Sequence, residues 1–159
     1  MRSVGFLLLV PLLVAPQAAV AETVNGSGAL ALAALVGNVS PLVSKSQKDV
    51  LAKLLDGQAN FNFPAGETIS VVAQKLTCRA SNVDIKSHSC DLTFGSQSAA
   101  LTGRRAHELF ATLAEVRVPP DGAAGSIFEA VSSFKCTIDP NEVKQNSGGG
   151  AECQYAPPN

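Results

Sequence analysis

Two histidines, His88 and His107, are the side chains best suited to acid–base chemistry near neutral pH, and the chain contains no others. A general base works only with a second group within hydrogen-bond reach. Nothing in the spacing places the two histidines together, and His88, two residues before Cys90, is expected to be exposed. One enzymatic alternative stays open, a periplasmic hydrolase-type enzyme in which His107 acts with Glu108 or Arg105.

Motifs for nucleophilic or phosphate chemistry are weak. Ser132 and Lys135 match the S-x-x-K pair of penicillin-recognising enzymes, which also need S-D-N and K-T-G. Here the pair falls in a predicted strand and neither companion motif occurs, so we interpret the match as coincidence. Residues 147–150 lack the Lys-Ser/Thr of a phosphate loop, and residues 139–142 lack calcium-loop spacing. They are interpreted as a hairpin tip and a turn.

The basic segment around Arg104, Arg105 and His107 is the best candidate for a binding site, because it holds the only adjacent arginines. The apolar stripe of the same predicted helix avoids these three residues and consists of Ala106, Leu109, Phe110 and Leu113. One interpretation is a solvated helix face. The other is an anion-binding patch. Arginine can form a bidentate pair of hydrogen bonds with a carboxylate or phosphate, and the N-terminus of a helix favours negative charge. Lys45 and Lys48 lie near the start of an earlier predicted helix and would extend this patch.

Four cysteines, Cys78, Cys90, Cys136 and Cys153, indicate two disulfides rather than a metal site. They form no C-x-x-C pair, and no histidine lies at the spacing of a zinc finger. Four cysteines allow three pairings, and loop entropy favours the two local bonds by only about 1 kcal/mol each. Another signal must therefore choose among the pairings.

The first residues are typical of a secretory signal peptide. Arg2 supplies the positive start, residues 4–14 are apolar, and Ala19-Val20-Ala21 forms a cleavage site before Glu22. An uncleaved anchor helix is the alternative, which Pro11 and Pro16 argue against. We expect a periplasmic or secreted protein with a signal peptide over residues 1–21 and no transmembrane anchor after cleavage.

The remaining residues, 22–159, have the size of a single domain. They carry 11 Lys and Arg against 13 Asp and Glu, so nothing in the charge favours nucleic acid. Tryptophan is absent, which leaves little material for stacking on bases or sugars. No motif indicates a cofactor or a metal site.

An internal repeat organises this domain. A predicted helix at residues 49–56 aligns with one at residues 108–115, and each is followed by a β-rich run that ends in a cysteine. A second cysteine follows each run after a polar turn. The pattern predicts a lead-in segment at 22–44 and two helix–β-hairpin repeats at 45–96 and 102–156. Each hairpin would then carry one disulfide, Cys78–Cys90 or Cys136–Cys153, although chance similarity of two amphipathic helices would also give the alignment.

The predicted fold is α+β, with an antiparallel sheet packed by helices at 46–56 and 103–115. Ser46 and Asp49 form a capping box for the first of these, and Gly57 ends it. A further buried helix is expected at 29–36. Residues 125–134 also fit a helix, but β-branched residues in the aligned segment favour a strand. The expected core residues are Leu51, Leu54, Leu55, Leu109, Phe110 and Leu113.

Taken together, these observations predict a non-enzymatic binding or inhibitor-like module of the bacterial envelope. Its expected partner is a protein or an acidic ligand, held by Arg104, Arg105 and His107.

Overall fold

The computed structural model describes residues 21–81, 84–114, 126–146 and 148–156. Nearly all of the predicted signal peptide lies outside these residues. The described chain is α+β, as predicted, with four α-helices and two antiparallel sheets. The elements in chain order are β1 (Glu22–Asn25), α1 (Gly26–Val39), α2 (Lys45–Leu55), β2 (Ile69–Ala73), β3 (Lys75–Ser81), the short 3₁₀ helix η1 (Ile85–Ser87), β4 (Ser89–Phe94), β5 (Gln97–Thr102), α3 (Gly103–Ala114), β6 (Ser126–Val131), β7 (Ser133–Ile138), α4 (Pro140–Gln145) and β8 (Ala151–Ala156).

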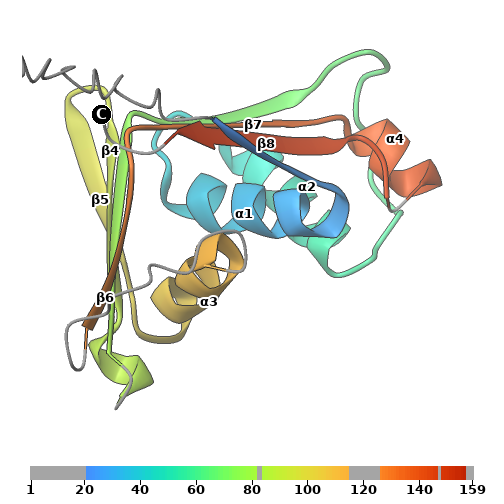
Figure 1. Ribbon diagram of the computed structural model, residues 1–159. Helices are drawn as coiled ribbons and strands as arrows, with labels where there is room; N and C mark the ends of the chain where they lie inside the picture. The colour runs from blue at the N-terminus through green and yellow to red at the C-terminus, as the bar shows by residue number, and fades with distance from the viewer. Residues whose placement is uncertain (1–20, 82–83, 115–125, 147, 157–159) are drawn as a thin grey trace, which may run out of the picture.

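Two four-stranded sheets replace the single sheet expected from the sequence. The first has the order β1-β8-β7-β2 and the second the order β5-β4-β3-β6. They meet at a corner, with α1, α2 and α3 on its inner side (Figure 1). The strand assignment over residues 126–134 is therefore correct, and the helical alternative for that segment is wrong.

Both long β-rich runs cross from one sheet to the other. Gln74 alone separates β2 from β3, and Ser132 alone separates β6 from β7. At these bends, Gln74 N–H donates to the Thr93 carbonyl and Ser132 N–H donates to the Ala156 carbonyl, both at 2.8 Å. Since β2 pairs with β7 and β3 pairs with β6, the two bent runs form the seam that joins the sheets.

The two disulfides have the predicted pairing. Cys78 and Cys90 face each other across β3 and β4, and Cys136 and Cys153 face each other across β7 and β8. All four side chains are buried. Disulfides persist in oxidising compartments, so the pairing indicates a location outside the cytoplasm.

Local chemistry sets the ends of the helices. Ser44 caps α2, because its hydroxyl accepts from Gln47 N–H while the Gln47 side chain accepts from Ser44 N–H. The predicted box of Ser46 and Asp49 is therefore wrong by two residues. Gly57, with φ +69°, follows α2 as predicted. Asp139, expected in a turn, instead caps α4 by accepting from Asn141 N–H and Glu142 N–H.

The core fills the inner side of the corner, where α1 packs on the first sheet and α3 on the second. Five of the six predicted core residues are buried: Leu51, Leu54, Leu109, Phe110 and Leu113. Leu55 is 49% exposed, contrary to the prediction. The reason is that α2 packs mainly on α1, so only the narrower stripe that includes Leu51 and Leu54 is covered. No helix among the described residues is both long and apolar enough to cross a membrane.

Candidate functional site

A groove between α1, α2 and α3 contains one of the three predicted binding residues. It encloses about 280 Å³. Ala34, Leu35, Ala52 and Leu55 form its apolar walls, and Asn38, Lys48, Arg105 and Glu108 add polar groups. The half-exposed Leu55 thus lines this groove. Helices that are distant in sequence bring Lys48 and Arg105 to one cavity.

The structure separates His107 from the two arginines. Arg105 lines the groove, whereas Arg104 has a side chain that is 88% exposed and contacts Glu108 at the edge of the groove. His107 lies on the flank of α3 opposite Arg105, because successive residues on a helix are turned by about 100°. Arg104, Arg105 and His107 therefore do not converge on one ligand.

The acidic side chain of the groove is paired with a cation, whereas its two basic side chains are not paired with a carboxylate of the described residues. Arg104 Nε lies 3.0 Å from Glu108 Oε1, so the one carboxylate of the groove already has a cation beside it. Within the described part of the chain, neither Lys48 nor Arg105 forms a salt bridge. Both remain available to an anion from outside the chain.

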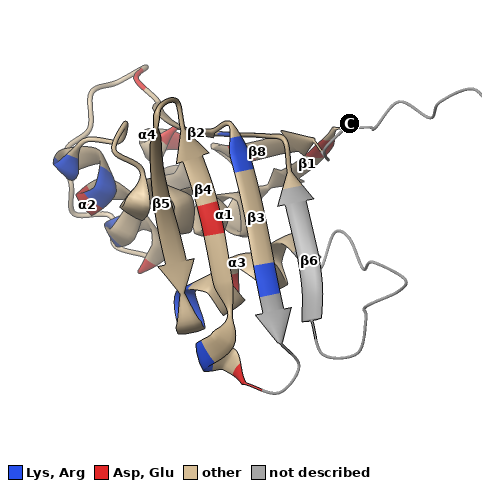
Figure 2. Cartoon of the chain, turned by 90° about the vertical axis from the view of Figure 1, so that its left-hand side faces the viewer, with Lys and Arg blue, Asp and Glu red and all other residues tan. Residues whose placement is uncertain are grey.

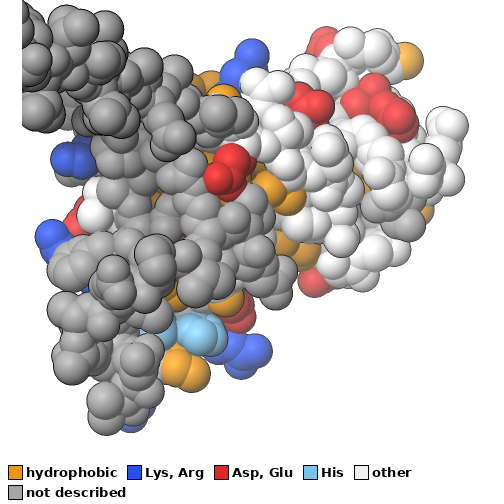
Figure 3. Space-filling model, in the orientation of Figure 1, with side chains coloured by type: hydrophobic (Ala, Val, Ile, Leu, Met, Phe, Trp, Pro, Cys, Tyr) orange, Lys and Arg blue, Asp and Glu red, His pale blue; other side chains and the backbone are white. Residues whose placement is uncertain are grey.

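The two histidines, expected to be apart, lie in contact. His88 Nδ1 and His107 Nδ1 are 3.2 Å apart, and the ring centroids are 4.9 Å apart. His88 is only 5% exposed, so the expectation of an exposed side chain is wrong. The reason is that His88 immediately precedes β4, which begins at Ser89, and that the start of β4 packs against α3. Histidine atoms reach the surface in Figure 3 beside apolar and basic side chains.

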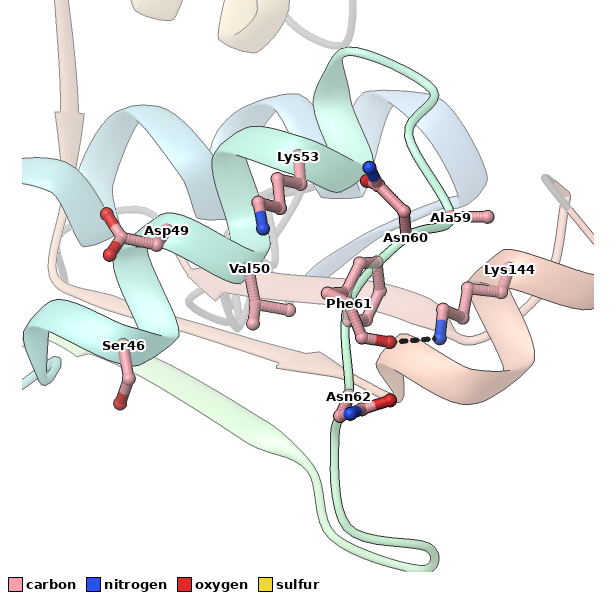
Figure 4. Close-up of a pocket in the computed structure, with 9 residues that line it drawn as sticks. All are labelled: Ser46, Asp49, Val50, Lys53, Ala59, Asn60, Phe61, Asn62 and Lys144. Carbon is pink, nitrogen blue, oxygen red and sulfur yellow. Dashed lines mark hydrogen bonds between the residues drawn. The ribbon is translucent and has the colours of Figure 1, made fainter.

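A larger depression of about 600 Å³ lies between α2, residues 59–62 and α4. Figure 4 shows that its lining is mainly polar, with Asp49 and Lys53 on α2 and Lys144 on the facing helix. Lys144 Nζ donates to the Phe61 carbonyl at 2.6 Å and lies 4.0 Å from the centre of the Phe61 ring. The amine therefore fastens residues 59–62 to α4, and Asp49 opposes the charge of Lys53. This depression and the groove therefore each combine two cations with one carboxylate, and they differ in that Glu108 of the groove is paired with Arg104.

On β3, β4 and β5, the strands of the second sheet that Figure 2 draws in colour, the outer face carries few charges. Arg79 on β3 and Asp91 on β4 lie 3.5 Å apart and are both well exposed. Their neighbours across the face are small or polar, such as Thr77, Thr93 and Ala100. The described side chains of this face thus form no charge pattern that would define a partner.

Acidic side chains line a third cavity beside α4, where Asp139, Glu142 and Glu152 lie near the glycines at 148–150. The Asp139 carboxylate is occupied by the first N–H groups of α4. In the described residues, no three His, Cys, Asp or Glu side chains cluster tightly enough to hold a metal ion by themselves.

Comparison with known proteins gives no relative: no family model, no curated protein and no solved structure matches the chain. The function must therefore be argued from the geometry of this molecule.

Proposed function

We propose that the protein acts by binding, and that the groove between α1, α2 and α3 receives an acidic segment of a partner protein. The observation that carries this proposal is the placement of Lys48 and Arg105, from two helices, at one cavity with aliphatic walls. Two cations in a confined cleft attract a carboxylate from solution and orient it. Arginine adds a two-pronged contact that fixes the carboxylate plane.

The walls of the groove favour a peptide over a free inorganic anion. Leu35 and Leu55 offer apolar surface next to the cations, and a phosphate ion would leave that surface exposed to water. An aliphatic side chain one or two residues from an Asp or Glu would cover it. The occupant that fits is thus a protein segment with an acidic residue beside a Leu, Ile or Val.

The hydrolase alternative has less support. His107 does have a second polar group beside it, His88. An enzyme also needs a cavity for its substrate, and neither histidine lines any of the three cavities described above.

We place this binding activity outside the cytoplasm, in the periplasm or the medium. The predicted signal peptide and the disulfides support this location.

We also propose that the domain is a duplicated unit in which α1, rather than α2, corresponds to α3. Gly26 and Gly103 both have positive φ, at 65° and 60°, and each begins a helix. Three residues later, the carbonyls of Ala29 and Ala106 lie 3.2 and 3.6 Å from a disulfide sulfur. This alignment replaces the predicted match of 49–56 with 108–115. In this alignment α2 has no counterpart in the second unit. The groove residues on α2, which include Lys48, therefore belong to a helix that only the first unit has.

Peptide selection tests the binding proposal. A random peptide library would be selected on the folded protein, and the dissociation constants of enriched peptides would be measured by isothermal titration calorimetry. We expect enrichment of Asp or Glu next to an aliphatic residue. The double substitution Lys48→Ala with Arg105→Ala should weaken binding by about tenfold or more, the loss expected when charged hydrogen bonds are removed.

A matched control separates the groove from general charge attraction. Lys45→Ala with Lys86→Ala removes the same charge from exposed positions that do not line the groove. We expect this control to change affinity by less than about threefold at 0.15 M salt, where exposed charges are largely screened. Equal losses for both double variants, or enrichment of peptides without acidic residues, would contradict the proposal.

A further inference from the structure

A further cavity adjoins the groove on the other side of Leu55. This adjoining cavity encloses about 390 Å³ between α1, the C-terminal end of α2, residues 57–59 and α4. Its apolar surface comes from Leu30, Leu54, Leu55 and Val143. Leu55 lines both cavities and is 49% exposed, so its side chain forms the ridge between them.

One face of α1 runs along both cavities. Ser27 and Leu30 line the adjoining cavity, and Ala34, Leu35 and Asn38 line the groove. Residues three or four positions apart on a helix are neighbours on its surface, so these side chains form a single stripe. The two cavities are therefore consecutive parts of one surface, with α2 along its other side.

The charges of this surface fit one acidic segment along its whole length. Among the described residues, Lys144 lines the adjoining cavity and no carboxylate does. The Lys144 amine donates to the Phe61 carbonyl and has two further N–H groups that can donate to another acceptor. Cations thus lie at both ends of the surface, Lys48 and Arg105 at one and Lys144 at the other, with leucine side chains between them.

The length of the stripe sets the spacing of the side chains that can occupy it. Leu30 and Asn38 are eight positions apart on α1, which is about 12 Å along the helix axis. In an extended segment, the side chains at i, i+2 and i+4 point to the same side and span about 13 Å. An acidic residue at the Asn38 end therefore places two alternate aliphatic residues on the two sides of Leu55.

We propose that the partner segment binds in an extended conformation, with one aliphatic side chain in the groove and a second in the adjoining cavity. This inference rests on the proposed binding function and specifies its partner: an acidic segment with the pattern acidic-x-aliphatic-x-aliphatic, in either chain direction. The first aliphatic residue contacts Leu35 and Leu55. The second packs on Leu30, Leu54 and Val143, which are nearly buried and form the floor of the adjoining cavity.

A double-mutant cycle tests the adjoining cavity. Ser27 is exposed and lines this cavity but not the groove, so Ser27→Phe would fill it. The tightest peptide from the library selection, and the same peptide with alanine four positions from its acidic residue, would be titrated by calorimetry into wild-type and variant protein. We expect each change alone to weaken binding by about fivefold or more, because one aliphatic side chain is no longer buried. Together they should cost little more than either alone, since both remove the same contact.

The matched control is Ser46→Phe. Ser46 is also exposed in the first turn of a helix, α2, but it lines neither the groove nor the adjoining cavity, so this variant should bind the peptide as the wild type does. The inference would be overturned by equal binding of Ser27→Phe and wild type, or by enriched peptides that have one aliphatic residue or two at helical spacing. In each of these cases, weaker binding by Lys48→Ala with Arg105→Ala would still support the binding function.

The remaining outcomes concern the partner itself. No loss in the Lys48→Ala, Arg105→Ala double variant, or a selection that yields no binding peptide, would overturn both the inference and the binding function. Sedimentation of the protein alone tests for a second copy as the occupant, and a dimer that Ser27→Phe disrupts would overturn the inference. Should Ser27→Phe fail to fold, the alanine-substituted peptide on wild-type protein decides the question.

Discussion

Gly57 and Gly150 have almost the same backbone angle, φ +69° and +70°, but very different surroundings. A Cβ at Gly57 would meet nothing within 4 Å. At Gly150, it would lie 2.8 Å from Val143 N and 2.9 Å from the Asp139 carbonyl, both backbone atoms at the start of α4. Substitutions at the two positions therefore separate the free-energy cost of a positive φ from the cost of steric crowding around an added Cβ.

We predict that Gly57→Ala lowers the free energy of unfolding by about 1–2 kcal/mol, the cost of a left-handed conformation for a residue with a Cβ. Gly150→Ala should lower the free energy of unfolding by at least about 1 kcal/mol more than Gly57→Ala does, because the backbone of α4 must move to admit the methyl group. Urea denaturation monitored by circular dichroism measures both. Equal losses would show that the chain around Gly150 is looser than described.

Residue types predicted burial well and side-chain neighbours poorly. The helical stripe of Leu109 and Leu113 could be predicted because periodicity depends only on the local element. The contact between His88 and His107 could not, because it depends on how the start of β4 packs under α3. Leu55 was assigned to the core for a related reason: the pattern cannot reveal how wide a stripe the neighbouring element covers.

At the scale of elements, the two disulfides join strands that are already paired. Each closes a local loop, with sequence separations of 12 and 17 residues. The sequence predicted this pairing because each cysteine pair followed the same order of features. The bends at Gln74 and Ser132 escaped prediction, because β propensity continues through both and the bend depends on the seam between the sheets.

Removing either disulfide should therefore cost a similar amount of stability. We predict that Cys78→Ala with Cys90→Ala, and Cys136→Ala with Cys153→Ala, each lower the free energy of unfolding by about 3 kcal/mol. Both partners are replaced so that no free thiol remains to form a wrong bond. Non-reducing peptide mapping of the wild-type protein is the accompanying check, and a peptide that joins Cys78 to Cys136 would contradict the fold.

At the scale of the whole molecule, the groove exists only because α2 and α3 approach α1 from different parts of the chain. The sequence indicated the basic residues, including Lys48 and Arg105, but placed Arg104 and His107 in the same site. Helix periodicity alone cannot say which flank of α3 faces another helix and which faces η1. Only the packing of three helices inside the corner of the sheets separates these residues.

The most direct test of the binding account is to map where an acidic peptide contacts the folded protein. The ¹⁵N-labelled protein would be titrated with the tightest peptide from the selection, and amide shifts would be followed by NMR. The account predicts that the largest changes fall at residues 34–38, 48–55 and 105–108, around the groove. Largest changes on the outer face of the second sheet, near Thr77 and Asp91, or in the depression around Lys144, would contradict it.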